Sequence, residues 1–443
     1  MADEMGGTRQ KLVVRTLGCK VNQCESDAIL QGLTQPGGLF VPGKDGSADL
    51  VIINTCTVTQ KAGMQSRQMV RQAVRANPGA QIVVTGCHAQ MSPDELYAID
   101  GVDQVIGNPD KLCIPEMARF GGCGCETADD ARFRGISGAG HQGRTRPFLK
   151  IQDGCDAFCT YCIVPHARGR SRSMPVRQVL DALHGLAQQG VQEVVLTGIH
   201  IGCYGRDLSP ATGLWALLCR VRDEIAIPRI RLSSIEPMEL SDDIIALAAG
   251  DTRQTGKLCP HFHVPLQSGD NDILARMHRP YTREFFRDRI ISVMDRVADA
   301  AIGVDVLVGF PGESDAAFEQ THDLIASLPV AYLHVFPFSA RKGTPAFSFK
   351  NPVPARVIKA RCDQMRKLGH EKRWSFYSRY PGKTLRVLIE TSRDKKTGLL
   401  KGLTDNYGRV WVDGPDALFN TLQNMDIEKI SSDSTLTGRL SAD

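Results

Sequence analysis

Short runs of apolar, β-branched residues recur through residues 8–118, and three of them are followed by small or polar residues and then by a cysteine. The runs are "LVVRTLGC", ending at Cys19, "LVIINTC", ending at Cys56, and "IVVTGC", ending at Cys87. A stretch with helical periodicity, "QKAGMQSRQMVRQAVRAN", separates the second run from the third. Cysteine spacings of 37 and 31 residues suit βα units, so the pattern predicts an open parallel sheet.

The three cysteines are expected to meet at one edge of this sheet, because the carboxyl ends of parallel strands lie there side by side. A lone cysteine after a strand is usually a small buried hydrophobic residue. Three cysteines at the same position of successive units favour a shared site instead. Cys19, Cys56 and Cys87 are therefore candidate metal ligands.

Residues 119–140 lack periodicity and are rich in glycine and polar residues, which is typical of a linker. Cys113, Cys123 and Cys125 lie at or near its start. We interpret them as ordinary reduced thiols, with a metal-binding "CGC" pair as the alternative.

A second alternating pattern fills residues 141–375. Amphipathic stretches such as "VRQVLDALHGLAQQG" separate apolar runs at 148–152, 193–198, 230–235, 261–266, 303–310 and 332–338. About six such repeats predict a partial βα barrel rather than an eightfold one. The predicted fold class is therefore α/β.

The tail, residues 376–443, consists of short β-rich runs broken by turns such as "DKKTG", "DNYG" and "DGPD". This pattern predicts a small all-β barrel of the size used for RNA contact. A role in packing or solubility is the alternative.

Composition and charge narrow the class of protein. Of the 443 residues, 42% are hydrophobic and 23% charged, as in a soluble globular protein. The sequence has neither an apolar amino-terminal segment nor a run of about 20 apolar residues, so we expect a cytoplasmic protein without a membrane span. Fourteen cysteines in such a chain favour metal binding over disulfides.

Basic residues are concentrated in two islands. Residues 341–373 hold ten Lys or Arg and two acids, and residues 141–177 hold seven and two. Arg67, Arg71 and Arg75 also recur every four residues in the predicted helix after Cys56. These arginines form either a solvated face or a stripe that contacts phosphates.

The run "CDAFCTYC" places three cysteines, Cys155, Cys159 and Cys162, directly after the first strand of the predicted barrel. A cubane iron–sulfur cluster has four iron corners and is usually held by four thiolates. Structural zinc also takes four ligands, and the nearby His166 would have to be the fourth. The spacing favours a cluster with one open corner.

Motifs in this order resemble those of the radical S-adenosylmethionine methylthiotransferases. They are "TLGCKVNQ", "INTCTVT", "VTGCHAQ", "CDAFCTYCIVPHARG", "LTGIHIG", "RLSSIEP", "HVPLQSGD" and "VLVGFPGE". The resemblance spans nearly the whole chain and includes a carboxyl-terminal region similar to a TRAM domain. It implies a Rossmann- or flavodoxin-like first domain and a radical S-adenosylmethionine barrel.

The resemblance implies two 4Fe–4S clusters. The loop cysteines, Cys155, Cys159 and Cys162, would hold a cluster whose fourth iron is chelated by S-adenosylmethionine. One electron from this cluster would cleave the sulfonium to a 5′-deoxyadenosyl radical. The dispersed cysteines, Cys19, Cys56 and Cys87, would hold an auxiliary cluster that carries the transferred sulfur.

Residues at the ends of the barrel strands are expected to bind S-adenosylmethionine. They are Gly198, Glu236, Gln267, Ser268 and Gly309. For Glu236, an ordinary loop carboxylate near a helix start is an equal alternative. No acid or base residue is assigned a catalytic role, because the cofactor carries the hard chemistry.

The expected reaction adds a methylthio group to C2 of N6-threonylcarbamoyladenosine 37 in tRNA, since "TLGCKVNQ" and "INTCTVT" are most similar to that branch of the family. Alternatives are N6-isopentenyladenosine 37 or a ribosomal-protein aspartate, and, in another class, a non-catalytic iron–sulfur RNA-binding protein. The expected partners are a tRNA anticodon loop and an electron donor such as flavodoxin or ferredoxin. Cys24, five residues after Cys19, is a spare thiol that would compete as a ligand.

Overall fold

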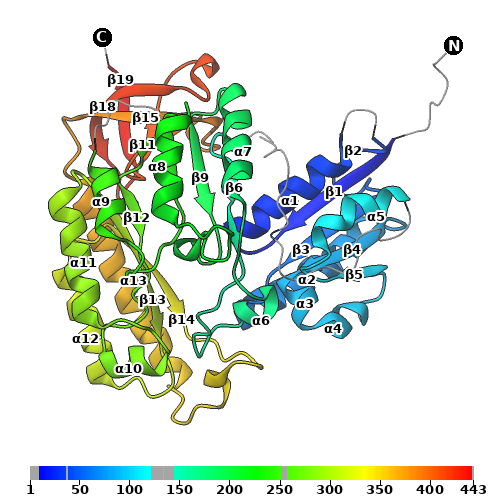
Figure 1. Ribbon diagram of the computed structural model, residues 1–443, viewed down its shortest axis with the longest axis horizontal. Coiled ribbons are helices and arrows are strands. Elements are labelled where there is room, and N and C mark those ends of the chain that lie inside the picture. The colour runs from blue at the N-terminus through cyan, green and yellow to red at the C-terminus, as the bar shows by residue number, and fades with distance from the viewer. Residues whose placement is uncertain (1–8, 36–37, 121–132, 134–143, 251–256, 442–443) are drawn as a thin grey trace.

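The amino-terminal part of the chain is a five-stranded parallel sheet (Figure 1). The structure, a computed structural model, describes residues 9–35, 38–120, 133, 144–250 and 257–441. The strands are β1 (Gln10–Thr16), β2 (Phe40–Pro42), β3 (Leu50–Thr55), β4 (Gln81–Gly86) and β5 (Gln104–Ile106). Their order, β2-β1-β3-β4-β5, is the flavodoxin-like one, so the predicted sheet is confirmed.

Helices cover both faces of this sheet. They are α1 (Lys20–Leu33), α2 (Gln60–Ala76), α3 (Cys87–Met91), α4 (Pro93–Tyr97) and α5 (Ile114–Phe120). Alternate residues of β3 point to opposite faces: Ile52 packs with Ile29 of α1, whereas Ile53 packs with Val70 of α2. A strand that is covered on both sides is apolar on both faces, which explains the run "LVII".

The middle of the chain forms a partial barrel of parallel strands surrounded by helices. Its strands are β6 (Phe148–Lys150), β9 (Glu193–Thr197), β10 (Arg229–Leu232), β11 (Lys257–Leu258), β12 (His261–His263), β13 (Ala301–Val308) and β14 (Tyr332–Pro337). They pair as two sheets, β6-β9-β10-β11 and β12-β13-β14. All six predicted strands are present, and β11 is additional.

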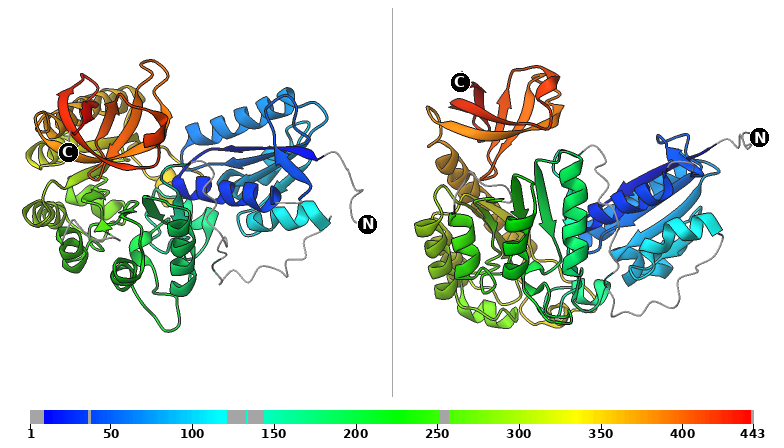
Figure 2. Two further views of the ribbon diagram at one scale, coloured as in Figure 1. Left: turned by 90° about the horizontal axis from the view of Figure 1, so that it is seen from above. Right: turned by 45° about the horizontal axis from the view of Figure 1, so that its top comes forward.

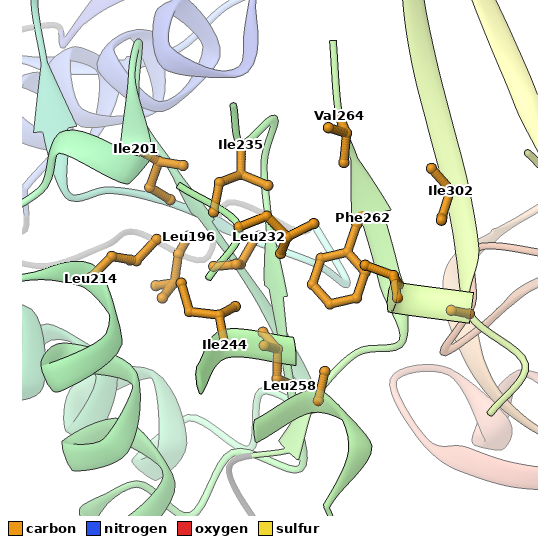
Figure 3. Packing of buried hydrophobic residues seen from close by; sticks show 14 of the residues in the cluster. Leu196, Ile201, Leu214, Leu232, Ile235, Ile244, Leu258, Phe262, Val264 and Ile302 are labelled. Carbon is orange, nitrogen blue, oxygen red and sulfur yellow. The ribbon is translucent and has the colours of Figure 1, made fainter. Parts of the chain in front are cut away.

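Outer helices shield the barrel strands from solvent. They are α7 (Val176–Gln188), α8 (Leu214–Glu224), α9 (Asp242–Ala249), α10 (Asn271–Arg276), α11 (Arg283–Arg296), α12 (Asp315–Ser327) and α13 (Ala355–Tyr377). Figure 3 shows the resulting core, in which Leu196, Leu232 and Phe262 of the strands pack with Leu214 and Ile244 of the helices.

The last strands close into a small barrel, as predicted. They are β15 (Thr384–Arg393), β16 (Leu400–Thr404), β17 (Arg409–Val412), β18 (Leu422–Ile430) and β19 (Leu436–Leu440), in the order β15-β16-β17-β19-β18. This carboxyl-terminal barrel has its own core and lies over one end of the partial barrel (Figure 2). Within the described ranges, no helix combines the length and apolar character needed to cross a membrane.

Two cysteines of the predicted linker, Cys123 and Cys125, lie outside the described residues, as does most of that linker. Cys113 is disulfide-bonded, so its interpretation as a reduced thiol is wrong. The domain boundaries drawn from the sequence remain predictions.

Candidate functional site

A loop that begins after β6 carries the three closely spaced cysteines. Two short strands, β7 (Gln152–Asp153) and β8 (Arg172–Ser173), pair and close the base of this cysteine loop, residues 154–171. Within it, Cys155 N–H donates to the carbonyl of Gly169 at 3.1 Å. Gly154 has φ +72°, and a Cβ there would lie 1.9 Å from the carbonyl oxygen of Arg170. The closure therefore requires glycine at this position.

The three thiols of the cysteine loop are free and face a common region. Cys159 is buried, while Cys155 and Cys162 are half-buried. Burial raises the pKa of Cys162 to about 12, and the neighbouring Cys159 and Cys155 act in the same direction. Because a bound metal deprotonates its thiol ligands, such a group of thiols is suited to metal binding.

Hydrogen-bond donors surround these sulfur atoms. His200 Nδ1 lies 3.4 Å from Cys155 Sγ, and its Nε2 lies 2.9 Å from Glu239 Oε2. Arg279 Nη1 donates to Cys159 Sγ at 3.4 Å and also pairs with Glu236. Charge-assisted donors of this kind stabilise thiolates.

The dispersed cysteines come together at the carboxyl edge of the first sheet. Thr55 of β3 is paired with Gly86 of β4, so Cys56 and Cys87 follow neighbouring residues. Gly18, just before Cys19, has φ +106°, and a Cβ there would lie 3.0 Å from Cys56 Cβ. Burial raises the pKa of Cys56 to about 11, and the nearby Cys87 and Cys19 act in the same direction.

The two cysteine sets lie on adjoining elements. The helix α6 (Val164–Arg168), just beyond Cys162, packs against α3, whose first residue is Cys87 (Figure 1). Asn108 Nδ2 links them: it lies 3.7 Å from Cys87 Sγ and 2.6 Å from the carbonyl oxygen of Ala167. Cys24 donates its thiol to the carbonyl of Phe148 at 3.4 Å, so it is engaged with β6.

A buried charge network joins the first sheet to the partial barrel beside both cysteine sets. Its members are Glu25, Lys111, Lys150, Asp153 and Arg168. Glu25 accepts from Lys111 Nζ at 2.7 Å, from Lys150 Nζ at 2.9 Å and from Arg168 Nη1 at 3.0 Å.

The cations of this network control the ionisation of Glu25. Burial by itself would raise the pKa of Glu25, but these cations hold it well below its usual range. Arg168 is also within electrostatic reach of Cys87 and Cys19. Three cations for two carboxylates leave a positive excess beside the thiols.

The zinc alternative finds no support among the described residues. Histidine, cysteine or acidic groups whose ligand atoms all lie within 4.8 Å of one another occur at His200–Cys203–Glu239 and at His263–Asp305–His334. Neither group contains a member of the two cysteine sets. His166 is exposed and contacts the Phe158 ring edge-on.

The residues expected to bind S-adenosylmethionine lie after β9, β10, β12 and β13, at the end of the barrel that carries the cysteine loop. A Cβ on Gly198 would lie 2.8 Å from Gln152 Oε1. Gln267 has φ +68° and forms a bridge with Val306 of β13.

Ser268, Gly309 and Glu236, three of the residues predicted to bind S-adenosylmethionine, contact other side chains of the protein. Ser268 contacts Thr321 of α12, and Gly309 donates its N–H to Glu313. Burial raises the pKa of Glu236, which pairs with Arg279. Their role in binding the cofactor stays a prediction.

Sequence reasoning did not identify Arg279, His200 or Glu25. His200 lies within the quoted motif "LTGIHIG", whereas Arg279 lies outside the quoted motifs. Their contacts with cysteines span 45 and 120 residues. The position of Glu25 on the apolar face of α1, one turn after Val21 and one turn before Ile29, was the available signal, because a carboxylate there must find a buried partner.

The geometry of the site and the comparisons with known proteins together identify the class of enzyme. Residues 149–325 match the model of the radical SAM superfamily, and residues 11–107 match that of "Uncharacterized protein family UPF0004". A solved radical S-adenosylmethionine methyltransferase, TsrM from Kitasatospora setae, has a similar fold, with a TM-score of 0.53 and 16% identity over 76% of this chain and 77% of that one. The protein is thus a radical S-adenosylmethionine enzyme.

Relatives that match nearly the full length of the chain identify the family within this class of enzymes. Threonylcarbamoyladenosine tRNA methylthiotransferase MtaB of Bacillus subtilis is 37% identical over 94% of this chain and 93% of its own length. Its counterpart in Aquifex aeolicus is 37% identical over 90% and 95%. A tRNA-2-methylthio-N(6)-dimethylallyladenosine synthase of Staphylococcus aureus is 29% identical over 96% and 84%. The chain belongs to the radical S-adenosylmethionine methylthiotransferase family.

Proposed function

We propose that this protein adds a methylthio group to C2 of N6-threonylcarbamoyladenosine 37 in tRNA. The observation that carries the proposal is the presence of two sets of three free cysteines on adjoining elements, one in a loop and one at the edge of the first sheet. A generator of radicals alone needs only the first set. Relatives that are 37% identical over most of the chain carry the name of this activity.

The cysteines fit two iron–sulfur clusters by the chemistry of the donor set, because each set offers three free thiols. Cys155, Cys159 and Cys162 would hold one 4Fe–4S cluster and S-adenosylmethionine, and Cys19, Cys56 and Cys87 would hold the other. When bound, these groups supply the electron, the radical and the sulfur that the reaction needs.

The chain's own residues orient and insulate these groups. Arg279 and His200 donate to the loop sulfurs, while Glu236 and Glu239 hold the two donors in place. The buried charge network fixes the cysteine loop to the first sheet through side chains that are almost fully buried. In such a site the protein provides binding and orientation rather than proton transfer.

The RNA is proposed to contact exposed basic side chains and the carboxyl-terminal barrel. Part of the two basic islands is internal: Arg146, Lys150, Arg168 and Arg361 are paired with carboxylates. The exposed remainder of the islands includes Arg356, Lys359 and Lys367 of α13. Outside the islands, Arg71 and Arg75 of α2 are also exposed. Such side chains neutralise phosphates.

The proposal includes a cytoplasmic location and a small electron donor such as flavodoxin or ferredoxin, because the loop cluster must be reduced for each turnover. A target in the anticodon loop suits the site, since an unpaired base can be turned out of its stack.

Nucleoside mass spectrometry of tRNA from a strain that lacks this gene tests the substrate. We expect the methylthio group to disappear only from threonylcarbamoyladenosine and to return on complementation. Its disappearance from the isopentenyl form instead would contradict the proposal. Failure of the reduced, reconstituted protein to release 5′-deoxyadenosine from S-adenosylmethionine would favour the non-catalytic alternative.

A further inference from the structure

All three parts of the molecule contribute to a cluster of charged and aromatic side chains in the interior of the partial barrel. The junction cluster consists of Lys20 from α1, Arg146 and Arg231 from the barrel region, Asp305 from β13, and Tyr407 from the carboxyl-terminal barrel. Lys20 is within electrostatic reach of the other four. It directly follows Cys19, one of the dispersed cysteines.

Asp305 and its neighbours line the barrel interior. Val304, Val306 and Val308 of β13 belong to the core beneath the outer helices, so the alternate residues, including Asp305, point inward. Tyr407 reaches the same region, where its ring stacks on His261 with centroids 4.4 Å apart. The junction cluster is therefore an internal surface.

In the part of the chain that the structure describes, Lys20 is the cation of the junction cluster that has no directly paired carboxylate, although Asp305 attracts it from farther away. Arg231 pairs with Glu193 at 2.7 Å, and Arg146 pairs with Glu390 at 2.9 Å. Asp305 is engaged by His263 at 2.6 Å and by His334 at 3.2 Å. Among the described residues, Lys20 forms neither a hydrogen bond nor an ion pair, although its side chain is half-buried.

A half-buried ammonium group without a partner is unfavourable, and a ligand that supplies a carboxylate would remove the penalty. We propose that Lys20 binds the carboxylate of the threonylcarbamoyl group and thereby selects the N6 substituent of the target adenosine. This inference rests on the proposed function and deepens it. The dimethylallyl group named for the Staphylococcus aureus relative has no charge to offer.

The same ammonium group rejects neutral substituents. An uncharged N6 group in this position would leave Lys20 desolvated and unpaired. The enzyme therefore discriminates both through the ion pair formed with the acid and through the cost of burying Lys20 beside a neutral group. One charge-assisted hydrogen bond corresponds to about a ten- to hundredfold preference.

The test compares anticodon stem–loop RNAs that carry threonylcarbamoyladenosine either as the free acid or as its neutral methyl ester. The readouts are the ratio of kcat/KM for the two RNAs and the ratio of their equilibrium dissociation constants with the reconstituted enzyme. The fraction of active enzyme is the same for both RNAs in one preparation, so it cancels in each ratio. The iron content of each preparation shows whether both clusters are present. The variants are K20M, K20R and, as a matched control, K61M, which alters an exposed lysine of α2.

We expect the wild type and K61M to prefer the acid by about ten- to hundredfold. K20M should reduce both ratios to about threefold or less, and K20R should restore most of the preference. A wild-type ratio near one, or a K20M ratio equal to that of the wild type, would overturn the assignment of Lys20 alone. A wild-type enzyme that modifies only an isopentenyladenosine RNA would overturn both the assignment and the proposed function.

Discussion

At the scale of single residues, the decisive contacts join side chains far apart in the sequence. Cys19, Cys56 and Cys87 were predictable because each follows a strand in the same way, and strands of one sheet end at one edge. Glu25 and Arg168 were not predictable as partners, because 143 residues separate them and neither local pattern encodes the other. Sequence periodicity indicates which face of a helix or strand is buried, but it does not indicate which side chains of other elements contact that face.

Replacing Arg168 should destabilise the fold strongly. R168M leaves Glu25 and Asp153 buried with fewer cations, so we expect a loss of about 3–5 kcal/mol in the free energy of unfolding. Urea unfolding of the reduced, cluster-free chain measures it. The control is R170M, whose side chain is 80% exposed and paired with Asp156, and its effect should stay below about 1 kcal/mol. Equal effects of the two variants would contradict the role of the network.

Asp305 should give the fold a measurable acid dependence. Burial by itself would raise the pKa of Asp305, but hydrogen bonds with His263 and His334 outweigh it and hold the pKa at about 2. A carboxyl group whose pKa is lower in the folded state, against about 3.9 unfolded, stabilises the protein above about pH 4 and loses this effect as the pH falls toward 2.

We therefore expect D305N to lower the free energy of unfolding by about 2 kcal/mol at neutral pH, and its difference from the wild type to shrink between about pH 4 and pH 2. Urea titrations across this range measure it. D323N, which alters an 80% exposed carboxylate, should match the wild type throughout. A D305N difference that is independent of pH would contradict the assigned pKa.

At the scale of elements, the sequence predicted the strands of the βα repeats, including the three-residue β6 and β12, which lie within longer apolar runs. The structure adds further short strands. The strands β2, β5, β7, β8 and β11 have two or three residues, too few to show a period of two. The two sheets of the partial barrel part between β11 and β12, where Cys259 and Pro260 intervene. There Cys259 N–H still donates to the carbonyl of Ile230 at 2.8 Å, and the carbonyl of Pro260 accepts from Ala301 N–H at 2.9 Å. Pro260 itself has no N–H to donate.

The strand β10 attaches the carboxyl-terminal barrel to the partial barrel. Arg229, 2% exposed, donates to the carbonyls of Arg386 and Leu403, and Arg231 donates to that of Asp405 at 2.9 Å. These contacts satisfy backbone carbonyls that strand pairing leaves available.

We expect R229M to loosen this attachment, so that amide hydrogen exchange in β15 and β16 becomes at least severalfold faster while the first sheet is unaffected. Hydrogen–deuterium exchange with mass spectrometry measures it. The matched control is R439M on β19, whose side chain is 73% exposed. Protection of β15 and β16 equal to that of the wild type would show that other contacts hold the barrel.

At the scale of the whole molecule, the arrangement of the three parts places the two cysteine sets on adjoining elements. The first sheet presents the dispersed cysteines and the partial barrel presents the cysteine loop. The carboxyl-terminal barrel contributes Tyr407, whose ring centroid lies 5.1 Å from the guanidinium carbon of Arg231. The first sheet, the partial barrel and the carboxyl-terminal barrel were each predictable from motifs and periodicity. Their placement relative to one another depends on buried ion pairs and backbone contacts, which the motifs do not indicate.

Single cysteine substitutions should separate the two chemistries. C159A should abolish both the release of 5′-deoxyadenosine and methylthio transfer, because the loop set would lose a ligand. C56A should retain release of 5′-deoxyadenosine but abolish transfer, with about half of the iron lost. Chromatography of 5′-deoxyadenosine, nucleoside mass spectrometry and iron analysis measure these effects. C219A, which alters a half-buried cysteine of α8 outside both sets, is the control. Transfer by C56A at the wild-type rate would contradict the division of roles.

During synthesis, the amino-terminal sheet leaves the ribosome before residues 148–168 do, since translation proceeds from the amino terminus. At that stage Glu25 has Lys111 as a partner, while Lys150 and Arg168 have not yet closed over the edge that carries Cys19, Cys56 and Cys87. Docking of the partial barrel then joins the cysteine loop to that edge, where Cys56 and Cys87 are buried and Cys19 is exposed. The order of segments along the chain thus allows the edge with the dispersed cysteines to form before the cysteine loop docks beside it.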